Sequence, residues 1–413
     1  MNPVIHGTFL HTPVFGQIHV FSAEIHVDDQ GCIAKIVEKP FEKTNTFYLP
    51  GFIDAHLHAP QFKNLRLGLD LPLLEWLHKT TFPTESTMTK KDEAFYSHMV
   101  TELLRKGTTT ACYFGTLGNE ANEALVRAVN AGGQRAFVGK VCMDKHSPEY
   151  YCESTEDSVA HTKEFVQMVN QVRSDLIKPI VSPRFAISCS MSSMLSLGSY
   201  AKENDLSIQT HISENKDEVK FVHELYSADY PNVYQDAGLL TPKTLLAHGV
   251  HLNAKELQVI KDSECTLVHC PNSNYSLNSG IASVRQWLDK DINVALGTDV
   301  SGGSSPSMLN AMQMAIIASK SINFLQDPGL HALSVAEVLF LATVGGAKAL
   351  HLPVGTFNVG MQFDALEVEY IPLFTKDEAD PVQHYMNLFH GFFYNGDDRH
   401  IKRVFVKGKQ VKL

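Results

Sequence analysis

Histidine is abundant in this chain, and several histidines stand where they could bind a metal ion. The 413 residues include 20 His, and imidazole is the commonest metal ligand and the side chain that titrates near neutral pH. His56 and His58 form an H-x-H pair at the end of an apolar run. Residues i and i+2 of a strand point to the same side, so both rings can reach one ion. Two solvated loop histidines are the alternative interpretation of this pair taken alone.

Three further polar residues end apolar runs elsewhere, namely His211, His248 and Asp299. Each has a structural interpretation by itself: an N-cap environment for His211, a buried hydrogen-bonded ring for His248 and a helix N-cap for Asp299. Together with His56 and His58, they place imidazole or carboxylate at four separate strand ends, which predicts a metal site. The expected ligand set is three nitrogens and one carboxylate oxygen. That set suits Zn²⁺ and leaves Fe²⁺ and Mn²⁺ open.

Such a site would activate water for hydrolysis. Zinc lowers the pKa of bound water from about 15.7 to roughly 7, which makes hydroxide available as a nucleophile at neutral pH. Glu214 follows His211 by three residues. Its carboxylate is therefore expected to carry the proton of the water to a leaving group.

The fold has to bring these distant residues together. Eight short apolar, β-branched runs alternate with amphipathic segments, at residues 51–56, 108–114, 136–143, 178–185, 206–211, 244–248, 265–270 and 293–299. Strands that alternate with helices predict βα units, and eight such units close a barrel. The carboxyl ends of barrel strands open onto one face, which holds the active site. Most of these runs end in an ionisable or polar residue, so we expect those residues to converge.

Both ends of the chain are rich in short strand patterns. Residues 1–50 and 356–413 are each too short to fold alone, and we expect them to pair into one small β-sandwich. Residues 51–355 would form the hydrolase barrel. The predicted fold class is therefore α/β: a (β/α)₈ TIM-like barrel with a small β-sandwich made by the N- and C-terminal segments.

Composition excludes several classes of function. Asp+Glu number 45 against 35 Lys+Arg, a formal charge of -10, and such a surface repels nucleic-acid phosphates and anionic lipid. We therefore expect neither nucleic acid nor a membrane as a partner. Seven cysteines, none spaced C-x-x-C, favour reduced thiols. The first ten residues lack a signal-peptide pattern. A cytoplasmic enzyme with a small-molecule substrate is expected.

Longer motifs resemble the metal-dependent amidohydrolase superfamily. The superfamily pattern comprises PGFIDAHLH at 50–58, His211, His248 and GTD at 297–299. Further segments are similar to the guanine deaminases within it: Gln61, LPLLEWL at 71–77, TFP at 81–83, GTTTACYF at 107–114, RAFVGKVCMD at 135–144, PRF at 183–185, HISEN at 211–215 and HCPNSN at 269–274. The resemblance covers roughly residues 50 to 350. The N-terminal part is short for the family, and Thr210 stands where a serine is common, but neither departure touches a motif residue.

The resemblance implies hydrolytic deamination of guanine to xanthine by a homodimer with one Zn²⁺ per chain. The implied metal ligands are His56, His58, His211 and Asp299. The implied catalytic residues are Glu214 as proton shuttle, His248 beside the hydroxide, and Asp299. The expected substrate contacts are Gln61, Arg184, Phe185, Trp76 and His211. Binuclear relatives carry a bridging lysine at the fourth strand end, where this chain has Arg184, so a single metal ion is implied.

Three alternatives stay open at this point. A deaminase or chlorohydrolase acting on a pterin, an adenosyl compound or a triazine would share the superfamily motifs. A non-catalytic assembly protein on the same barrel typically loses metal ligands, whereas all of them stand here. Arg184 can only donate hydrogen bonds, which suits the O6 acceptor of guanine. Alternatively, Arg184 could merely brace the barrel mouth through an ion pair with a neighbouring acid.

Overall fold

A barrel of parallel strands occupies the middle of the chain. The structure is a computed structural model, and it describes residues 3–373 and 378–411. The barrel strands, in spatial and chain order, are β5 (Phe52–His58), β6 (Thr108–Phe114), β7 (Arg135–Gly139), β9 (Ile177–Pro183), β10 (Ser207–Ile212), β11 (Thr244–His248), β12 (Thr266–His269) and β13 (Asn293–Leu296). All eight predicted strands are confirmed. The run at 136–143 divides into β7 and a short strand β8 (Val141–Cys142), which pairs with β9.

Main-chain hydrogen bonds complete the ring between its first and last strands. The N–H of Asp299 donates to the carbonyl of His56, and the N–H of His58 donates to the carbonyl of Val300, both at 2.9 Å. The barrel strands are buried along almost their whole length, as expected for a parallel sheet covered by helices. The closed ring places the residues after β13 directly against those at the end of β5.

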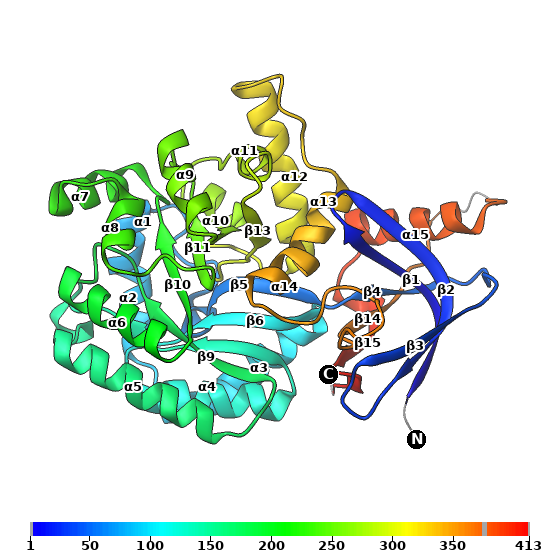
Figure 1. The fold of residues 1–413 in the computed structure, drawn as a ribbon, viewed down its shortest axis with the longest axis horizontal. Coiled ribbons are helices and arrows are strands. Elements are labelled where there is room, and N and C mark those ends of the chain that lie inside the picture. The colour runs from blue at the N-terminus through cyan, green and yellow to red at the C-terminus, as the bar shows by residue number, and fades with distance from the viewer. Residues whose placement is uncertain (1–2, 374–377, 412–413) are drawn as a thin grey trace.

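Helices surround the barrel (Figure 1). They are α1 (Leu73–Trp76), α2 (Phe82–Ser86), α3 (Glu93–Arg105), α4 (Asn119–Gly132), α5 (Thr155–Gln171), α6 (Met191–Glu203), α7 (Lys216–Tyr226), α8 (Tyr230–Asp236), α9 (Ala254–Asp262), α10 (Pro271–Ser276), α11 (Val284–Leu288), α12 (Met308–Leu325), α13 (Val335–Phe340) and α14 (Gly346–Ala349). Local signals set their ends. The Ser154 side chain accepts from the N–H of Asp157 at the start of α5, and Gly133 ends α4 with φ 68°.

The two ends of the chain meet in one seven-stranded mixed sheet, which confirms the predicted β unit. Its strands are β1 (Val4–Val14), β2 (Gln17–Val27), β3 (Ile33–Glu38), β4 (Thr46–Pro50), β14 (Ala365–Glu369), β15 (Ile401–Val406) and β16 (Lys409–Gln410), in the order β16-β15-β14-β4-β1-β2-β3. The helix α15 (Pro381–Asn395) lies beside it (Figure 1). Antiparallel pairing of Pro50 with Ala365 joins the N-terminal strands to the C-terminal ones. Stacked rings of Phe9 and Tyr48, 4.9 Å apart, lie in its core.

A buried ion pair links this sheet to the barrel. Arg135, at the start of β7, donates from Nε and Nη2 to the two carboxylate oxygens of Asp364 at 3.1 and 3.0 Å. Both side chains are buried. Because an unpaired charge in such a place is costly, the pair ties the start of β14 to the barrel wall.

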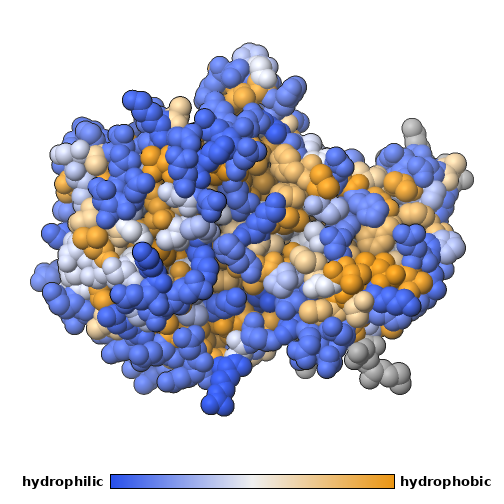
Figure 2. Space-filling view, in the orientation of Figure 1, coloured by the Kyte–Doolittle hydropathy of each residue, from blue (hydrophilic) through white to orange (hydrophobic). Residues whose placement is uncertain are grey.

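The surface is mostly polar, as expected for a chain with many charged residues. Figure 2 shows a mostly hydrophilic face, with hydrophobic side chains gathered over the terminal sheet. In the part of the chain that the structure describes, no helix is long and apolar enough to cross a membrane. All seven cysteines are free thiols. The expected domain limits, 1–50 with 356–413 and 51–355, stay a prediction, and residues 1–2, 374–377 and 412–413 within them lie outside the described residues.

Candidate active site

The polar residues that end the barrel strands meet at one mouth of the barrel, as expected. His56 and His58 end β5, Arg184 follows β9, His211 lies near the end of β10, His248 ends β11 and Asp299 follows β13. All of these side chains are buried. Five separate strand ends therefore supply the site, although the residues are scattered over most of the chain.

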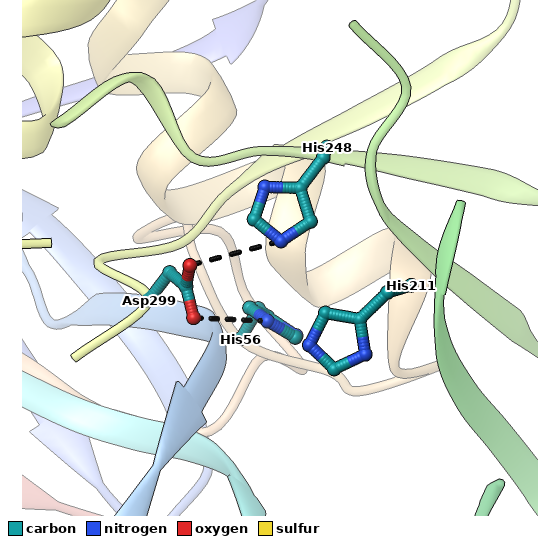
Figure 3. A group of neighbouring side chains, drawn as sticks. All are labelled: His56, His211, His248 and Asp299. Carbon is teal, nitrogen blue, oxygen red and sulfur yellow. Dashed lines mark ion pairs between the residues drawn. The ribbon is translucent and has the colours of Figure 1, made fainter. Parts of the chain in front are cut away.

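Three histidines and one aspartate form a compact group that could hold a metal ion (Figure 3). One ligand atom from each of His56, His211, His248 and Asp299 lies within 4.8 Å of the others. Asp299 faces two of them, with Oδ1 at 3.3 Å from His56 Nε2 and Oδ2 at 3.7 Å from His248 Nε2. His58 joins the same cluster, since its Nε2 lies 3.1 Å from His211 Nε2 and 3.4 Å from Asp299 Oδ1. All the predicted ligands are thus brought together, and His248 lies among them.

Hydrogen bonds from Nδ1 determine which ring nitrogen keeps a free lone pair. His211 Nδ1 donates to the carbonyl of Arg184 at 2.6 Å, and His248 Nδ1 donates to Asn274 Oδ1 at 3.0 Å. In a neutral ring the other nitrogen, Nε2, then carries a lone pair. The Nε2 atoms of His56 and His248 are buried with no hydrogen-bond partner among the described residues. Bare ring nitrogens gathered around one carboxylate fit a metal cation such as zinc.

Burial and neighbouring charge keep these groups in metal-binding protonation states. Burial lowers the pKa of His56, His58 and His211. Burial alone would raise the pKa of Asp299, but attraction to His56, His248 and His58 outweighs it and holds that pKa far below its usual range. Neutral imidazoles beside an ionised carboxylate are the forms that bind a metal ion.

Glu214 lies next to this group and is poised for proton transfer. Its Oε2 is 3.5 Å from His248 Nε2, and its Oε1 accepts from the Ser279 hydroxyl at 3.3 Å. Burial raises the pKa of Glu214 to about 8. A carboxyl group with a pKa near the working pH can both accept and donate a proton. Its backbone is held by Glu218, whose Oε2 accepts from the N–H of Glu214 at 2.8 Å.

A pocket with about 370 Å³ of open space lies beside these groups. Its lining residues are His58, Gln61, Leu73, Trp76, Leu77, Arg184, Phe185, His211, Glu214, Leu277 and Asp299. Every residue expected to contact substrate is among them. Trp76 donates from its indole N–H to the carbonyl of Leu67 at 3.0 Å, which fixes its ring at the wall.

Sequence reasoning missed Glu85, which lies behind the pocket wall. Its side chain is fully buried, and it forms an ion pair with Arg184, whose Nη1 donates to Oε2 at 2.6 Å and whose Nη2 donates to Oε1 at 3.1 Å. Gln61 Nε2 donates to Oε1 at 2.7 Å, and the Tyr151 hydroxyl donates to Oε2 at 2.9 Å. The ion pair considered as an alternative role for Arg184 therefore exists, and the same arginine also lines the pocket. A carboxylate 99 residues from its partner carries no spacing signal in the sequence.

Two residues near the metal group were also not singled out. Asn274 orients His248 and lies within the HCPNSN motif, which was the available signal. Asp54 accepts from the N–H groups of Thr298 and His56 at 3.0 and 3.3 Å. Asp54 thereby joins the first strand to the segment that carries Asp299.

Comparison with known proteins shows similarity to one enzyme family over nearly the whole chain. A model of the amidohydrolase family matches residues 47–411. The guanine deaminase of Dictyostelium discoideum is 42% identical over 98% of this chain and 97% of its own length. The guanine deaminase of Homo sapiens is 41% identical over 100% of this chain and 97% of its own length. A solved guanine deaminase from C. acetobutylicum, with guanine bound in its active site, has a TM-score of 0.92 and 32% identity, and the match covers 100% of both chains.

Proposed function

The chain belongs to the amidohydrolase family, and we propose that it hydrolyses guanine to xanthine and ammonia. Water supplies the oxygen that replaces the amino group at C2, and that group leaves as ammonia. One observation carries the proposal: Arg184 and Gln61 present hydrogen-bond donors to the same buried pocket as Glu214 and the histidine–aspartate group. Full-length similarity to a solved guanine deaminase that holds guanine supports it further.

We propose that one Zn²⁺ per chain is bound by His56, His58, His211 and Asp299. Three contacts support this assignment: Asp299 Oδ1 lies 3.3 Å from His56 Nε2 and 3.4 Å from His58 Nε2, and His58 Nε2 lies 3.1 Å from His211 Nε2. When bound, zinc supplies a Lewis acid that makes water nucleophilic at neutral pH. The metal-binding role is separate from that of His248, whose Nε2 lies between Glu214 and Asp299.

Proton transfer is assigned to the residues around Glu214. Glu214 accepts a proton from the attacking water and donates it to the departing amino nitrogen, a sequence that its pKa of about 8 favours. His248 orients the attacking water. Burial alone would lower the pKa of His248, but attraction to Glu214 and Asp299 outweighs it and raises that pKa. Asp299 stays ionised and accepts a hydrogen bond from the same water.

The pocket wall orients the purine. Arg184 donates to O6 of guanine, and Gln61 faces the ring-nitrogen edge near the reacting carbon. Phe185 and Trp76 pack against the ring. Adenine carries an amino donor where guanine carries O6, so it would oppose the donors of Arg184. A polar site of this kind can reject a mismatched analogue by up to about 10⁴–10⁵.

The test is a panel of aminated heterocycles assayed by absorbance and by ammonia release. We expect ready conversion of guanine to xanthine and negligible turnover of adenine, a pterin, adenosine and an amino-triazine. Absence of xanthine from guanine in zinc-loaded protein would refute the proposal. Faster turnover of one of the other heterocycles would reassign the substrate.

We further propose a cytoplasmic homodimer, as the family resemblance implies. Sedimentation velocity should give about twice the 45.9 kDa mass of one chain. Cell fractionation should recover the protein with cytoplasmic markers.

A further inference from the structure

We infer that Glu85 is a specificity-determining positioning residue: it fixes the donors of Arg184 and Gln61 so that the pocket selects purines with an acceptor at position 6. The inference rests on the proposed function. Glu85 lies in α2, outside the barrel strands, and its side chain is fully buried. It is not among the residues that line the pocket.

The carboxylate of Glu85 is fully used by the protein itself. An ionised carboxylate has about four lone-pair sites on its two oxygens. Oε1 accepts from Gln61 Nε2 and Arg184 Nη2, and Oε2 accepts from Arg184 Nη1 and the Tyr151 hydroxyl. No acceptor site is left for a ligand. Any effect of Glu85 on substrate must therefore pass through Arg184 and Gln61.

Glu85 determines how the amide of Gln61 is turned. The amide nitrogen lies 2.7 Å from Glu85 Oε1, while the amide oxygen accepts from the N–H of Ser301 at 3.0 Å. A flipped amide would set oxygen against the carboxylate and NH₂ against a backbone N–H, so only the observed orientation satisfies both neighbours. One amide N–H of Gln61 then remains for the pocket.

Glu85 also holds the guanidinium of Arg184 in one orientation and keeps it charged. Two of its five N–H groups donate to Glu85, which leaves three for other acceptors. The guanidinium carbon lies 5.1 Å from the centre of the Phe82 ring, which packs on the guanidinium. Burial alone would lower the pKa of Arg184, but attraction and hydrogen bonding to Glu85 outweigh it and raise that pKa.

These contacts predict what a change at Glu85 does. In Glu85→Gln, an amide NH₂ would oppose either Arg184 or Gln61, and the buried guanidinium would lose its counter-charge. In Glu85→Asp the charge stays, but the side chain is one methylene shorter and cannot reach both partners as before. Both variants should therefore misplace the donors, whereas only the first should leave Arg184 unpaired.

The experiment compares two non-substrate inhibitors, hypoxanthine, which has the O6 acceptor, and unsubstituted purine, which lacks it. The ratio of the inhibition constant of purine to that of hypoxanthine measures recognition of O6 without deamination. We expect this ratio to fall at least about tenfold in Glu85→Gln and Glu85→Asp, since a charge-assisted hydrogen bond is typically worth that much. Glu85→Asp should regain thermal stability relative to Glu85→Gln without regaining the ratio.

Asp364→Asn is the matched control. Asp364 is a buried carboxylate paired with an arginine through two hydrogen bonds, but it lies outside the pocket. This control should lower the melting temperature and leave the inhibitor ratio within twofold. A ratio within twofold of wild type in a folded Glu85 variant would overturn the inference, as would an equal loss of affinity for both inhibitors.

Two further measurements keep the test decisive. If both Glu85 variants are insoluble, Tyr151→Phe removes one of the four hydrogen bonds to Glu85 while keeping its charge. That variant should lower the ratio at least about twofold, and an unchanged ratio counts against the inference. If wild-type protein makes no xanthine from guanine, the proposed function is refuted. If wild-type protein is active and the inhibitor ratio is unchanged in the Glu85 variants, only the role of Glu85 is refuted.

Discussion

Replacing Glu214 by glutamine isolates the proton-transfer step. Glutamine has nearly the same size, and its amide oxygen can still accept from the Ser279 hydroxyl, which lies 3.3 Å from the carboxylate. What is lost is a group that exchanges a proton near neutral pH, because burial raises the pKa of Glu214 to about 8. General acid–base catalysis typically contributes about 10²–10⁴-fold. We therefore expect kcat to fall by that factor, or roughly 2.7–5.4 kcal/mol in activation free energy.

The assay pairs steady-state xanthine formation with elemental analysis of zinc. Glu214→Gln should retain about as much zinc as wild type, since Glu214 is not one of the proposed ligands and its carboxylate lies 3.5 Å from His248, which is not one either. The control is Glu218→Gln, a buried carboxylate that accepts from the Tyr230 hydroxyl and two backbone N–H groups and lies outside the pocket lining. It should lose stability and keep kcat within about tenfold. A metal-loaded Glu214→Gln variant with less than a threefold loss in kcat would show that another group moves the proton.

Three other outcomes follow from the site and the fold. Prolonged chelation should abolish guanine turnover, and Zn²⁺ should restore it. The zinc content should fall much further in His58→Ala than in His248→Ala. Full activity in metal-free protein would contradict the hydrolytic mechanism. Arg184→Ala should lower kcat/KM for guanine by at least about 10²-fold. It should also lower the melting temperature, because Glu85 is left buried without its partner. Unaltered guanine kinetics in the folded variant would show that Arg184 does not contact the substrate. Burial lowers the pKa of His11 from 6.5 to about 4, so the unfolded chain takes up this proton first as the pH falls. The free energy of unfolding should therefore decrease by up to about 3 kcal/mol between pH 6.5 and 4. Urea titrations at both pH values should show a smaller decrease in His11→Gln than in wild type. An equal decrease in the two proteins would show that His11 is not the group responsible.

The barrel was predictable because its signals are local and repeated. Each strand is a short apolar run followed by a helical pattern, and eight such units have one common closed arrangement. The terminal sheet was predictable only in outline. Strand-like residues at both ends indicate a β unit, but nothing local specifies that β4 pairs with β1 on one side and β14 on the other. Such pairings depend on contacts across the whole chain.

The same distinction applies to the site. His56, His211, His248 and Asp299 converge because all stand at strand ends, whose relative positions follow from the barrel. Glu85 does not belong to a strand, and its place behind Arg184 depends on how the segment after β5 crosses the barrel mouth. That path is irregular, since the segment consists of short helical turns from Ala59 to Ser86. Sequence patterns specify such a path poorly because no repeat or period describes it.

The terminal sheet has a consequence for the order of events during synthesis. β4 leaves the ribosome about 300 residues before β14, the strand with which it pairs. At about 5–20 residues per second, one edge of β4 waits on the order of 15–60 s for its neighbour. The nascent chain thus carries an open strand edge while the barrel is being made, and such edges readily pair with other chains. A chaperone that shields residues 46–50 during translation would raise the yield of folded protein without altering the finished molecule.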